Sequence, residues 1–415
     1  MYAATARLLA VLVVSGYMVT ACGMSTEGLP AATPVTFSSP DSIPAEETLA
    51  PTGSDAVPSS ASSTAAVDQS SPTSPTGSSI TSESIPATGT WENATEGLVG
   101  LTADCGNLAR VAVRPDRDVL IASVATHGLW STGEGTDSWS QLGTGRGSTP
   151  ITNRATTFIF DPVSPNTFWE AGIYGDGVYR TDDGGVTFRQ LGNISHVEGL
   201  SIDLTDPARR TLLATIHESA SVFLSTDGGA TWKDISGALP PDVGFATGPV
   251  AIDAQTFLVG TSNAAGSKLL RSADAGATWS TAYDAGVIRV PLRAQSDGAM
   301  YWLLERVNGI IVSNDDGETW SLVAPKSQTL PTGTGLIELY DGSLASIGND
   351  RVIRSTDHAA TWIPIGPQIP IDPQGVVYSP FRKAFYIWHA ECVSSTLSPV
   401  QDDSILRWNF DPTSA

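Results

Sequence analysis

Short apolar runs recur along residues 89–415, and turn-forming clusters of Gly, Asp, Asn and Pro separate them. One set reads ARVAV, TTFIFD, GLSID, GPVAID, IRVPLR, GLIELY and GVVYS. A second set follows it, reading VLIAS, NTFWEAG, TLLATI, TFLVGT, AMYWLL, SLASIG and AFYIWH, and a third includes GVYRT, SVFLS and GIIVS. Val, Ile, Phe and Tyr in such runs predict β-strands. No amphipathic helical pattern appears after residue 90, so we expect an all-β fold.

An octapeptide recurs after the third run of each repeat. It reads TDDGGVTF at 181–188, STDGGATW at 225–232, SADAGATW at 272–279, SNDDGETW at 313–320 and STDHAATW at 355–362, with a degenerate copy, TGEGTDSW, at 132–139. The closing aromatic residues of these copies are 41 to 49 residues apart. A period in the forties with several strands in each repeat is typical of a β-propeller blade.

Each octapeptide has the residues of a tight turn. Its Ser or Thr and its Asp can hydrogen-bond to the backbone of the turn, and its Gly can adopt a positive φ. The acidic, Gly-rich pattern is also similar to a calcium loop, but no copy has the six or more oxygen ligands that Ca²⁺ takes. We therefore predict a structural role for the octapeptide, and no metal or cofactor.

These octapeptides resemble the Asp-box, or BNR repeat, of the sialidase-like β-propellers. The resemblance implies a hairpin between the third and fourth strands of each blade, on the face opposite the ligand-binding funnel. GTWENATEGL at 89–98 matches the second half of a box without its first half. Seven aromatic residues and seven inner strands predict seven blades, with six or eight left open. The strand Thr90–Ala94 should close the ring beside the strand that contains Leu406 and Trp408.

The first 88 residues differ in composition from the repeats. Residues 1–21 contain an apolar run after Arg7 that is too short to span a membrane. The run ends in VTAC, which resembles the lipobox of bacterial lipoproteins and implies lipidation of Cys22; an ordinary signal peptide is the alternative. Residues 22–88 are rich in Ser, Thr, Pro and Ala and predict a disordered linker. The resemblance implies an extracytoplasmic protein, anchored to the bacterial membrane by lipid.

Charge and cysteine content restrict the partners. The chain has 22 Lys and Arg residues against 43 Asp and Glu, a formal charge of −21. Such a charge repels nucleic acid and anionic headgroups, so we expect no nucleic-acid partner, membrane contact through the lipid alone, and a monomer. Cys105 and Cys392 lie in loops expected beside the closing blade, and in an oxidising compartment they predict a disulfide. Two free thiols or a metal pair are the alternative.

Function in a propeller is expected on the face opposite the boxes. The candidate ligand-binding residues there are Tyr174, His217, Trp388 and His389, since aromatic rings suit sugars and protein side chains alike. The weaker catalytic candidates are Glu170, Glu305, Glu391, Arg289 and Arg306. Carboxylates around a funnel would suit glycoside hydrolysis by an acid–base pair.

The resemblance to sialidases does not extend to their catalytic residues. Those enzymes have an Arg-Ile-Pro motif before the first box, and here the approximate match, Arg289-Val290-Pro291, lies in a middle repeat. The sequence therefore predicts a surface-exposed propeller that binds a glycan or a protein, with an exo-acting glycoside hydrolase of sialidase type as the alternative. Whether it is an enzyme stays open.

Overall fold

The computed structural model describes residues 89–103, 106–262, 266–305, 309–323, 331, 334–391 and 397–414. The predicted signal peptide, linker and lipidation site, the two cysteines predicted to form a disulfide, and Arg306 lie outside this range. The described part is built from β-strands, together with one 3₁₀ turn at Ser236–Ala238. Among these residues, no helix is long and apolar enough to cross a membrane.

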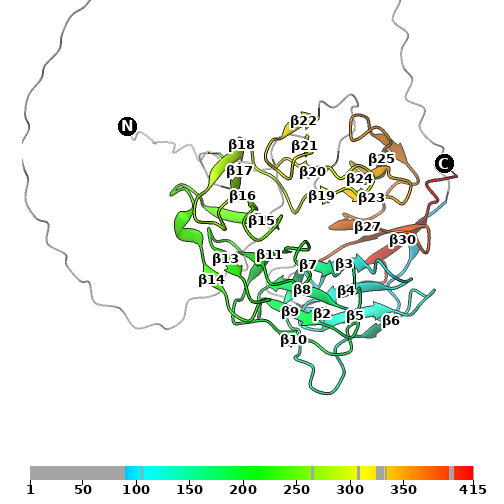
Figure 1. Ribbon diagram of the computed structural model, residues 1–415. Coiled ribbons are helices and arrows are strands. Elements are labelled where there is room, and N and C mark those ends of the chain that lie inside the picture. The colour runs from blue at the N-terminus through cyan, green and yellow to red at the C-terminus, as the bar shows by residue number, and fades with distance from the viewer. Residues whose placement is uncertain are drawn as a thin grey trace, which may run out of the picture. The chain divides into compact units, whose positions relative to one another are not determined.

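Seven four-stranded antiparallel sheets form a seven-bladed β-propeller, which confirms the predicted fold and blade count. Figure 1 shows the innermost strand of each blade facing a common centre. These inner strands are β3 (Leu108–Val113), β7 (Arg154–Phe160), β11 (Val197–Ile202), β15 (Phe245–Ala251), β19 (Leu292–Arg293), β23 (Ile337–Glu338) and β27 (Gly375–Ser379).

The remaining strands of each blade follow in chain order. The second strands are β4 (Leu120–Val124), β8 (Phe168–Ile173), β12 (Leu212–Ile216), β16 (Phe257–Ser262), β20 (Met300–Leu303), β24 (Leu344–Gly348) and β28 (Ala384–Trp388). The third are β5 (Gly128–Thr132), β9 (Val178–Thr181), β13 (Val222–Ser225), β17 (Lys268–Ser272), β21 (Ile310–Ser313), β25 (Arg351–Ser355) and β30 (Ile405–Asn409). The fourth are β6 (Trp139–Gln141), β10 (Arg189–Gln190), β14 (Lys233–Asp234), β18 (Ser280–Tyr283), β22 (Ser321–Val323), β26 (Ile363–Ile365) and β1 (Glu92–Asn93).

The core lies between neighbouring blades, which explains why the second strands are almost wholly apolar. Strands β4, β20, β24 and β28 are buried at every position, because both faces of each strand meet another blade. One such cluster joins Ile121 of the first blade to Phe168 and Tyr179 of the second. A strand with two buried faces has no need of the alternating polar pattern.

The N-terminal strand closes the ring, as the sequence predicted. Strand β1 pairs with β30, with Glu92 opposite Arg407 and Asn93 opposite Leu406. The last blade therefore combines three C-terminal strands with one from the start of the domain, in the order β1-β30-β28-β27. This pairing removes the two open edges that a linear array of blades would leave.

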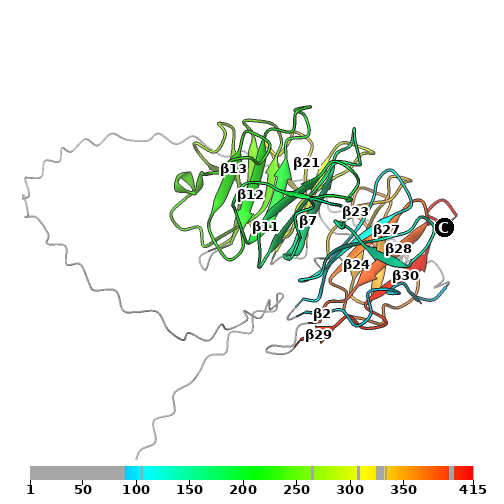
Figure 2. The same ribbon diagram turned by 90° about the horizontal axis from the view of Figure 1, so that it is seen from below.

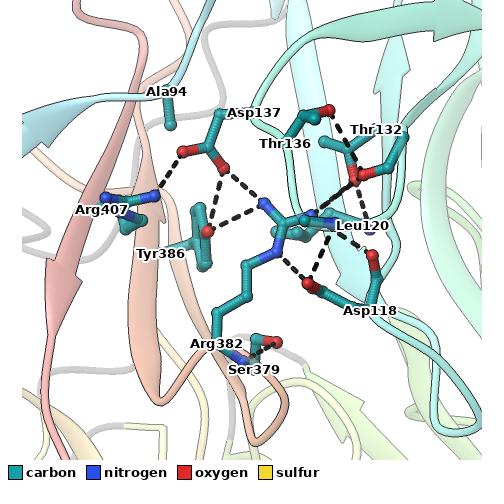
Figure 3. A network of polar contacts seen from close by, with 12 residues as sticks. Ala94, Asp118, Leu120, Thr132, Thr136, Asp137, Ser379, Arg382, Tyr386 and Arg407 are labelled. Carbon is teal, nitrogen blue, oxygen red and sulfur yellow. Dashed lines mark hydrogen bonds and ion pairs between the residues drawn. The ribbon is translucent and has the colours of Figure 1, made fainter.

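A network of charged side chains joins the first and last blades (Figure 3). Arg382, in the turn between β27 and β28, forms ion pairs with Asp118 and Asp137 of the first blade. Asp137 also accepts hydrogen bonds from Tyr386 at 3.0 Å and from Arg407 at 2.7 Å. The Arg382 side chain is only 8% exposed, so the network replaces the water that this guanidinium gives up on folding. We call these residues the seam network.

The five regular boxes have the turn structure that their sequence predicts. In the third blade, Ser225 Oγ donates to Asp227 Oδ1 at 2.8 Å and accepts from Gly229 N at 2.8 Å. Thr231 donates to the same carboxylate from its amide, at 2.9 Å, and from its hydroxyl, at 2.6 Å. Gly229 has a φ of 89°, and Ala359, which replaces Gly in the last box, adopts 68°. The conformation is therefore kept even where a Cβ makes it costly.

The sequence pattern did not predict one short strand pair. Strand β2 (Thr102–Ala103) pairs with β29 (Ser398–Pro399), and Figure 2 shows them side by side at one edge of the domain. Nearby, Gly106 N donates to Glu391 O at 2.8 Å. These contacts hold together the chain segments that flank Cys105 and Cys392, but the disulfide itself stays a prediction.

Candidate functional site

The loops of the propeller divide into two faces. Each box joins a third strand to a fourth, so the boxes and the turns between first and second strands lie at one end of the blades. The loops between second and third strands, and those that lead from a fourth strand into the next blade, lie at the other end. We call these the box face and the top face.

Tyr174 is the most exposed aromatic residue of the described second-to-third-strand loops. It lies between β8 and β9, is 38% exposed and has a φ of 57°. A non-glycine residue in this left-handed region is uncommon and needs support from its surroundings. That support includes His196, whose Nδ1 accepts a hydrogen bond from the Tyr174 amide at 3.3 Å. The ring of Tyr174 is therefore held at the surface by a neighbouring blade.

Tyr174 ends a row of three hydrogen-bonded side chains, which we call the triad. Its hydroxyl lies 3.2 Å from His217 Nε2, and the other ring nitrogen of His217 pairs with the Glu198 carboxylate. Glu198 lies on β11, and His217 directly follows β12, so the third blade supplies two members and the second blade supplies Tyr174. The His217 amide also donates to His196 O at 2.8 Å, which fixes the loop that carries the imidazole.

The triad lies among both signs of charge. The guanidinium of Arg154 lies over the Tyr174 ring, 4.7 Å from its centroid. Glu218 Oε1 is 3.8 Å from His217 Nε2. The pKa of His217 is raised, first by its hydrogen bond to Glu198 and then by the charges of Glu198 and Glu218, although burial opposes this. The imidazole therefore carries a proton over a wider pH range than a free histidine.

Glu170 lies on β8, the strand that leads into the loop of Tyr174, but its side chain is fully buried. Its Oε2 accepts a hydrogen bond from Asn153 Nδ2 at 3.3 Å, whereas Oε1 has no partner. Burial raises its pKa to about 8, so the carboxyl is neutral at pH 7. As a catalytic candidate it fails on geometry, because a fully buried side chain cannot reach a substrate at the surface.

The structure does not bring Trp388 and His389 to the triad. Trp388 is 3% exposed and packs in the core cluster with Leu108 and Ile405, so its ring cannot meet a surface ligand. Its apolar strand faces a neighbouring blade, which the sequence alone did not reveal. His389 lies at the end of the seventh blade, where its Nδ1 is 2.8 Å from Asp372 O.

The other catalytic candidates are dispersed. Glu305 follows β20 in the fifth blade, and Glu391 lies in the seventh, where its backbone amide donates to Asn107 Oδ1 at 3.1 Å. Arg289 is held in the left-handed region, with a φ of 59°, and donates to Gln374 O at 2.9 Å. Its charge and, more strongly, burial lower the pKa of Arg110 to about 10. The two guanidinium groups therefore interact electrostatically, with Arg110 on the inner strand β3 and Arg289 just before the inner strand β19.

Sequence reasoning missed three residues of the site: Arg154, His196 and Glu198. Arg154 begins β7, His196 precedes β11 and Glu198 is the second residue of β11, so all three lie where the chain enters a blade from the top face. A polar residue just before the apolar run, as Glu198 stands before GLSI, was the available signal. Within the described ranges, no group of three His, Cys, Asp or Glu side chains is arranged to hold a metal ion. The side chains of the triad and Arg154 supply hydrogen-bonding groups, an aromatic ring and charge at this site.

Comparisons with known proteins identify the fold more clearly than the activity. No protein-family model matches the sequence. A stretch of 186 residues, 44% of this chain, is 30% identical to the dispase autolysis-inducing protein of Streptomyces mobaraensis, and the match spans about half of that relative's length, 47%.

Two solved structures show the propeller fold. YCF48 bound to D1 peptide is 17% identical, with a TM-score of 0.51 over 80% of this chain and 100% of that one. The Cps50 (Swd1) β-propeller domain of Myceliophteria thermophila is 13% identical, with a TM-score of 0.53 over 75% of this chain and 100% of that one. At such low identity these likenesses support the fold and nothing finer.

Proposed function

We propose that this protein is an extracytoplasmic binding module that is tethered through lipid on Cys22. It takes a protein or glycan ligand on the top face, around Tyr174 and His217. The observation that carries the proposal is the triad: an exposed tyrosine is held in a rare backbone conformation and is hydrogen-bonded to a histidine of the next blade. Conformations of this kind persist where the surrounding structure supports them, and they cluster at ligand sites.

The composition of this face suits a polar ligand. Tyr174 presents an aromatic ring, which can stack on a sugar or pack against a peptide side chain. Arg154, His217, Glu198 and Glu218 add donors and acceptors around it. The name of the partial relative records an effect on dispase, which favours a protein among the two ligand classes.

The test compares two exposed aromatic residues on opposite faces. We expect Tyr174→Ala to weaken binding of the full-length protein to secreted proteins or arrayed glycans at least tenfold, as for a central aromatic anchor. Phe381, 47% exposed in the turn between β27 and β28, lies on the box face. Phe381→Ala is therefore the matched control and should bind normally. Equal loss in both variants, or in neither, would contradict the proposed face.

An exo-acting glycoside hydrolase of sialidase type is the second candidate. The electrostatic effect of Arg289 on Arg110 favours it, because a cluster of guanidinium groups suits the carboxylate of an acidic sugar. Against it, Arg293 pairs with Asp316 at 2.8 Å, and the hydroxyl of Tyr174 meets a histidine. Incubation with a fluorogenic sialoside decides between the candidates. Turnover that is lost in Arg289→Gln and kept in Arg293→Gln would establish the hydrolase.

A further inference from the structure

The triad can exist in two hydrogen-bonded forms, and the difference between them reaches the surface. Glu198 is bonded to His217 Nδ1, so that nitrogen keeps its proton as long as the carboxylate is ionised. Any change in the charge of His217 must therefore occur at Nε2, the nitrogen that lies 3.2 Å from the Tyr174 hydroxyl. Glu198 thus fixes the tautomer of the neutral ring, as a hydrogen-bonded carboxylate does in other histidine sites.

We propose that protonation of His217 reverses the hydrogen bond to Tyr174, so that the top face offers a donor in acid and an acceptor in alkali. When Nε2 carries a proton, it donates to the phenol oxygen, and the hydroxyl proton of Tyr174 turns away from the imidazole. When Nε2 is bare, it accepts that hydroxyl proton, and a lone pair of the phenol oxygen turns outward. One proton moves between solvent and Nε2, the phenol O–H rotates, and no other covalent bond forms or breaks.

Among the described residues, the charged and titratable groups that face His217 are compatible with this change. Glu198, on β11, and Glu218, in the histidine's own loop, both favour the protonated ring. From the second blade come Tyr174 and Arg154, whose guanidinium lies over the phenol ring. His196 meets the loop through its backbone oxygen, and its Nδ1 accepts from the Tyr174 amide, so it fixes the position of the phenol in both forms.

The two forms suit different ligand groups. In acid, the outward hydroxyl of Tyr174, together with the imidazolium of His217 and the guanidinium of Arg154, suits a carboxylate or a carbonyl oxygen. In alkali, the outward lone pair suits an amide N–H or a sugar hydroxyl. Glu198 therefore acts as a positioning residue: it decides which nitrogen titrates but lies behind the imidazole. The inference relies on the proposed function for its biological use, whereas its test requires no ligand.

The test follows both side chains through one pH titration of the full-length protein. Imidazole ¹⁵N shifts report the protonation of His217, and the five histidines of the chain can be assigned by single His→Gln variants. The ¹³Cζ shift of labelled tyrosine reports whether a phenol donates or accepts, and Tyr174→Phe identifies the signal of interest. We expect the Tyr174 signal to change with the same midpoint as His217, above the ordinary histidine value of 6.5.

Variants separate the proposed direction from a general effect of pH. Glu198→Gln should lower the midpoint of both signals, and His217→Gln should abolish the step at Tyr174 while tryptophan fluorescence stays native. Glu218→Gln, a change at 3.8 Å, should shift the midpoint less than Glu198→Gln. A Tyr174 signal that stays flat while His217 titrates, or a midpoint unchanged by Glu198→Gln, would overturn the inference. Neither result would affect the binding comparison of Tyr174→Ala with Phe381→Ala, so the two proposals fail separately.

Discussion

The octapeptide turns of the third and first blades occupy equivalent positions, but their first residues, Ser225 and Thr132, have different hydrogen-bond partners. In the third blade, Ser225 Oγ accepts from Gly229 N, four residues ahead, and its Asp227 bonds within the same octapeptide. In the first blade, Thr132 takes the place of Ser225, and its hydroxyl accepts from Leu120 N and from Arg382 of the last blade. The equivalent of Asp227 is Glu134, which is exposed.

The difference shows where the propeller needs help from outside a blade. A regular box satisfies its polar groups locally, through hydrogen bonds within its own octapeptide. The first blade meets the last, whose sheet is assembled from both ends of the domain. There the turn residues Thr132 and Asp137 bind Arg382 of the seam network, whereas the residues of a regular box bind within their own turn. The degenerate octapeptide thus marks the site of ring closure.

The comparison predicts that the closing strand matters most. Deletion of residues 89–98 removes β1 and leaves β30 as an open edge, with Arg407 unpaired from Glu92. We expect an aggregating protein without a cooperative unfolding transition, because an exposed edge strand pairs with other chains. Deletion of residues 25–80, in the predicted linker, is the control and should leave the melting curve unchanged. Size-exclusion chromatography and calorimetry measure both. A monomeric, cooperative protein without β1 would refute the role of the seam.

The next largest effect is expected from Arg382→Ala. The change removes the cation that Asp118 and Asp137 share, while Asp137 keeps its ion pair with Arg407. Removing one partner of a largely buried ion pair typically costs about 3–5 kcal/mol in the free energy of unfolding. Arg210 is a suitable control, since it is 66% exposed and pairs with Asp206 within one loop. Arg210→Ala should cost much less than Arg382→Ala, because an exposed ion pair contributes little to stability. Urea titrations measure both, and similar losses would argue against a special role for the seam.

Glu170 extends the comparison of boxes and ion pairs, because it is a buried acid that lies outside the octapeptides and, among the described residues, has no ion pair. Its pKa in the folded protein is about 8, above the ordinary 4.5. The folded state therefore binds this proton more tightly than the unfolded state, so stability falls as pH rises from 4.5 through 8. We expect Glu170→Gln, which resembles the neutral acid, to melt near the wild-type temperature at pH 5 and clearly above it at pH 9. Parallel pH profiles for the two proteins would show that Glu170 is ionised in the fold.

The smallest effect is expected for a single regular box. Asp227 is exposed to solvent and has a pKa lowered to about 2, chiefly by hydrogen bonds from Thr231. A depressed pKa stabilises the fold above 3.8, and that contribution is lost as pH falls toward 2. Asp227→Asn replaces one acceptor oxygen with a donor, so it should lower the melting temperature at pH 7 by less than Asp137→Asn does. As pH falls from about 4 to about 2, the difference between Asp227→Asn and the wild type should shrink.

The sequence alone determined the architecture of this protein. The spacing of the boxes and the order of apolar runs predicted seven blades, and the half-box at residues 89–98 predicted the partner of Leu406. These features are local or periodic: a turn needs its Asp, Thr and Gly within eight residues, and a blade repeats its strands in order. Even Ala359, which departs from the Gly of the pattern, keeps the backbone that the box requires.

The tertiary structure alone decided which polar residues meet. Tyr174 and His217 were singled out from the sequence, but His217 meets Tyr174 and Glu198 across two blades, at separations of 43 and 19 residues. The sequence suggested that Trp388 is a surface aromatic residue, whereas the neighbouring blade buries it. The pattern of residues along one strand cannot show which of its faces meets another blade, because that depends on side chains that lie far away in the sequence.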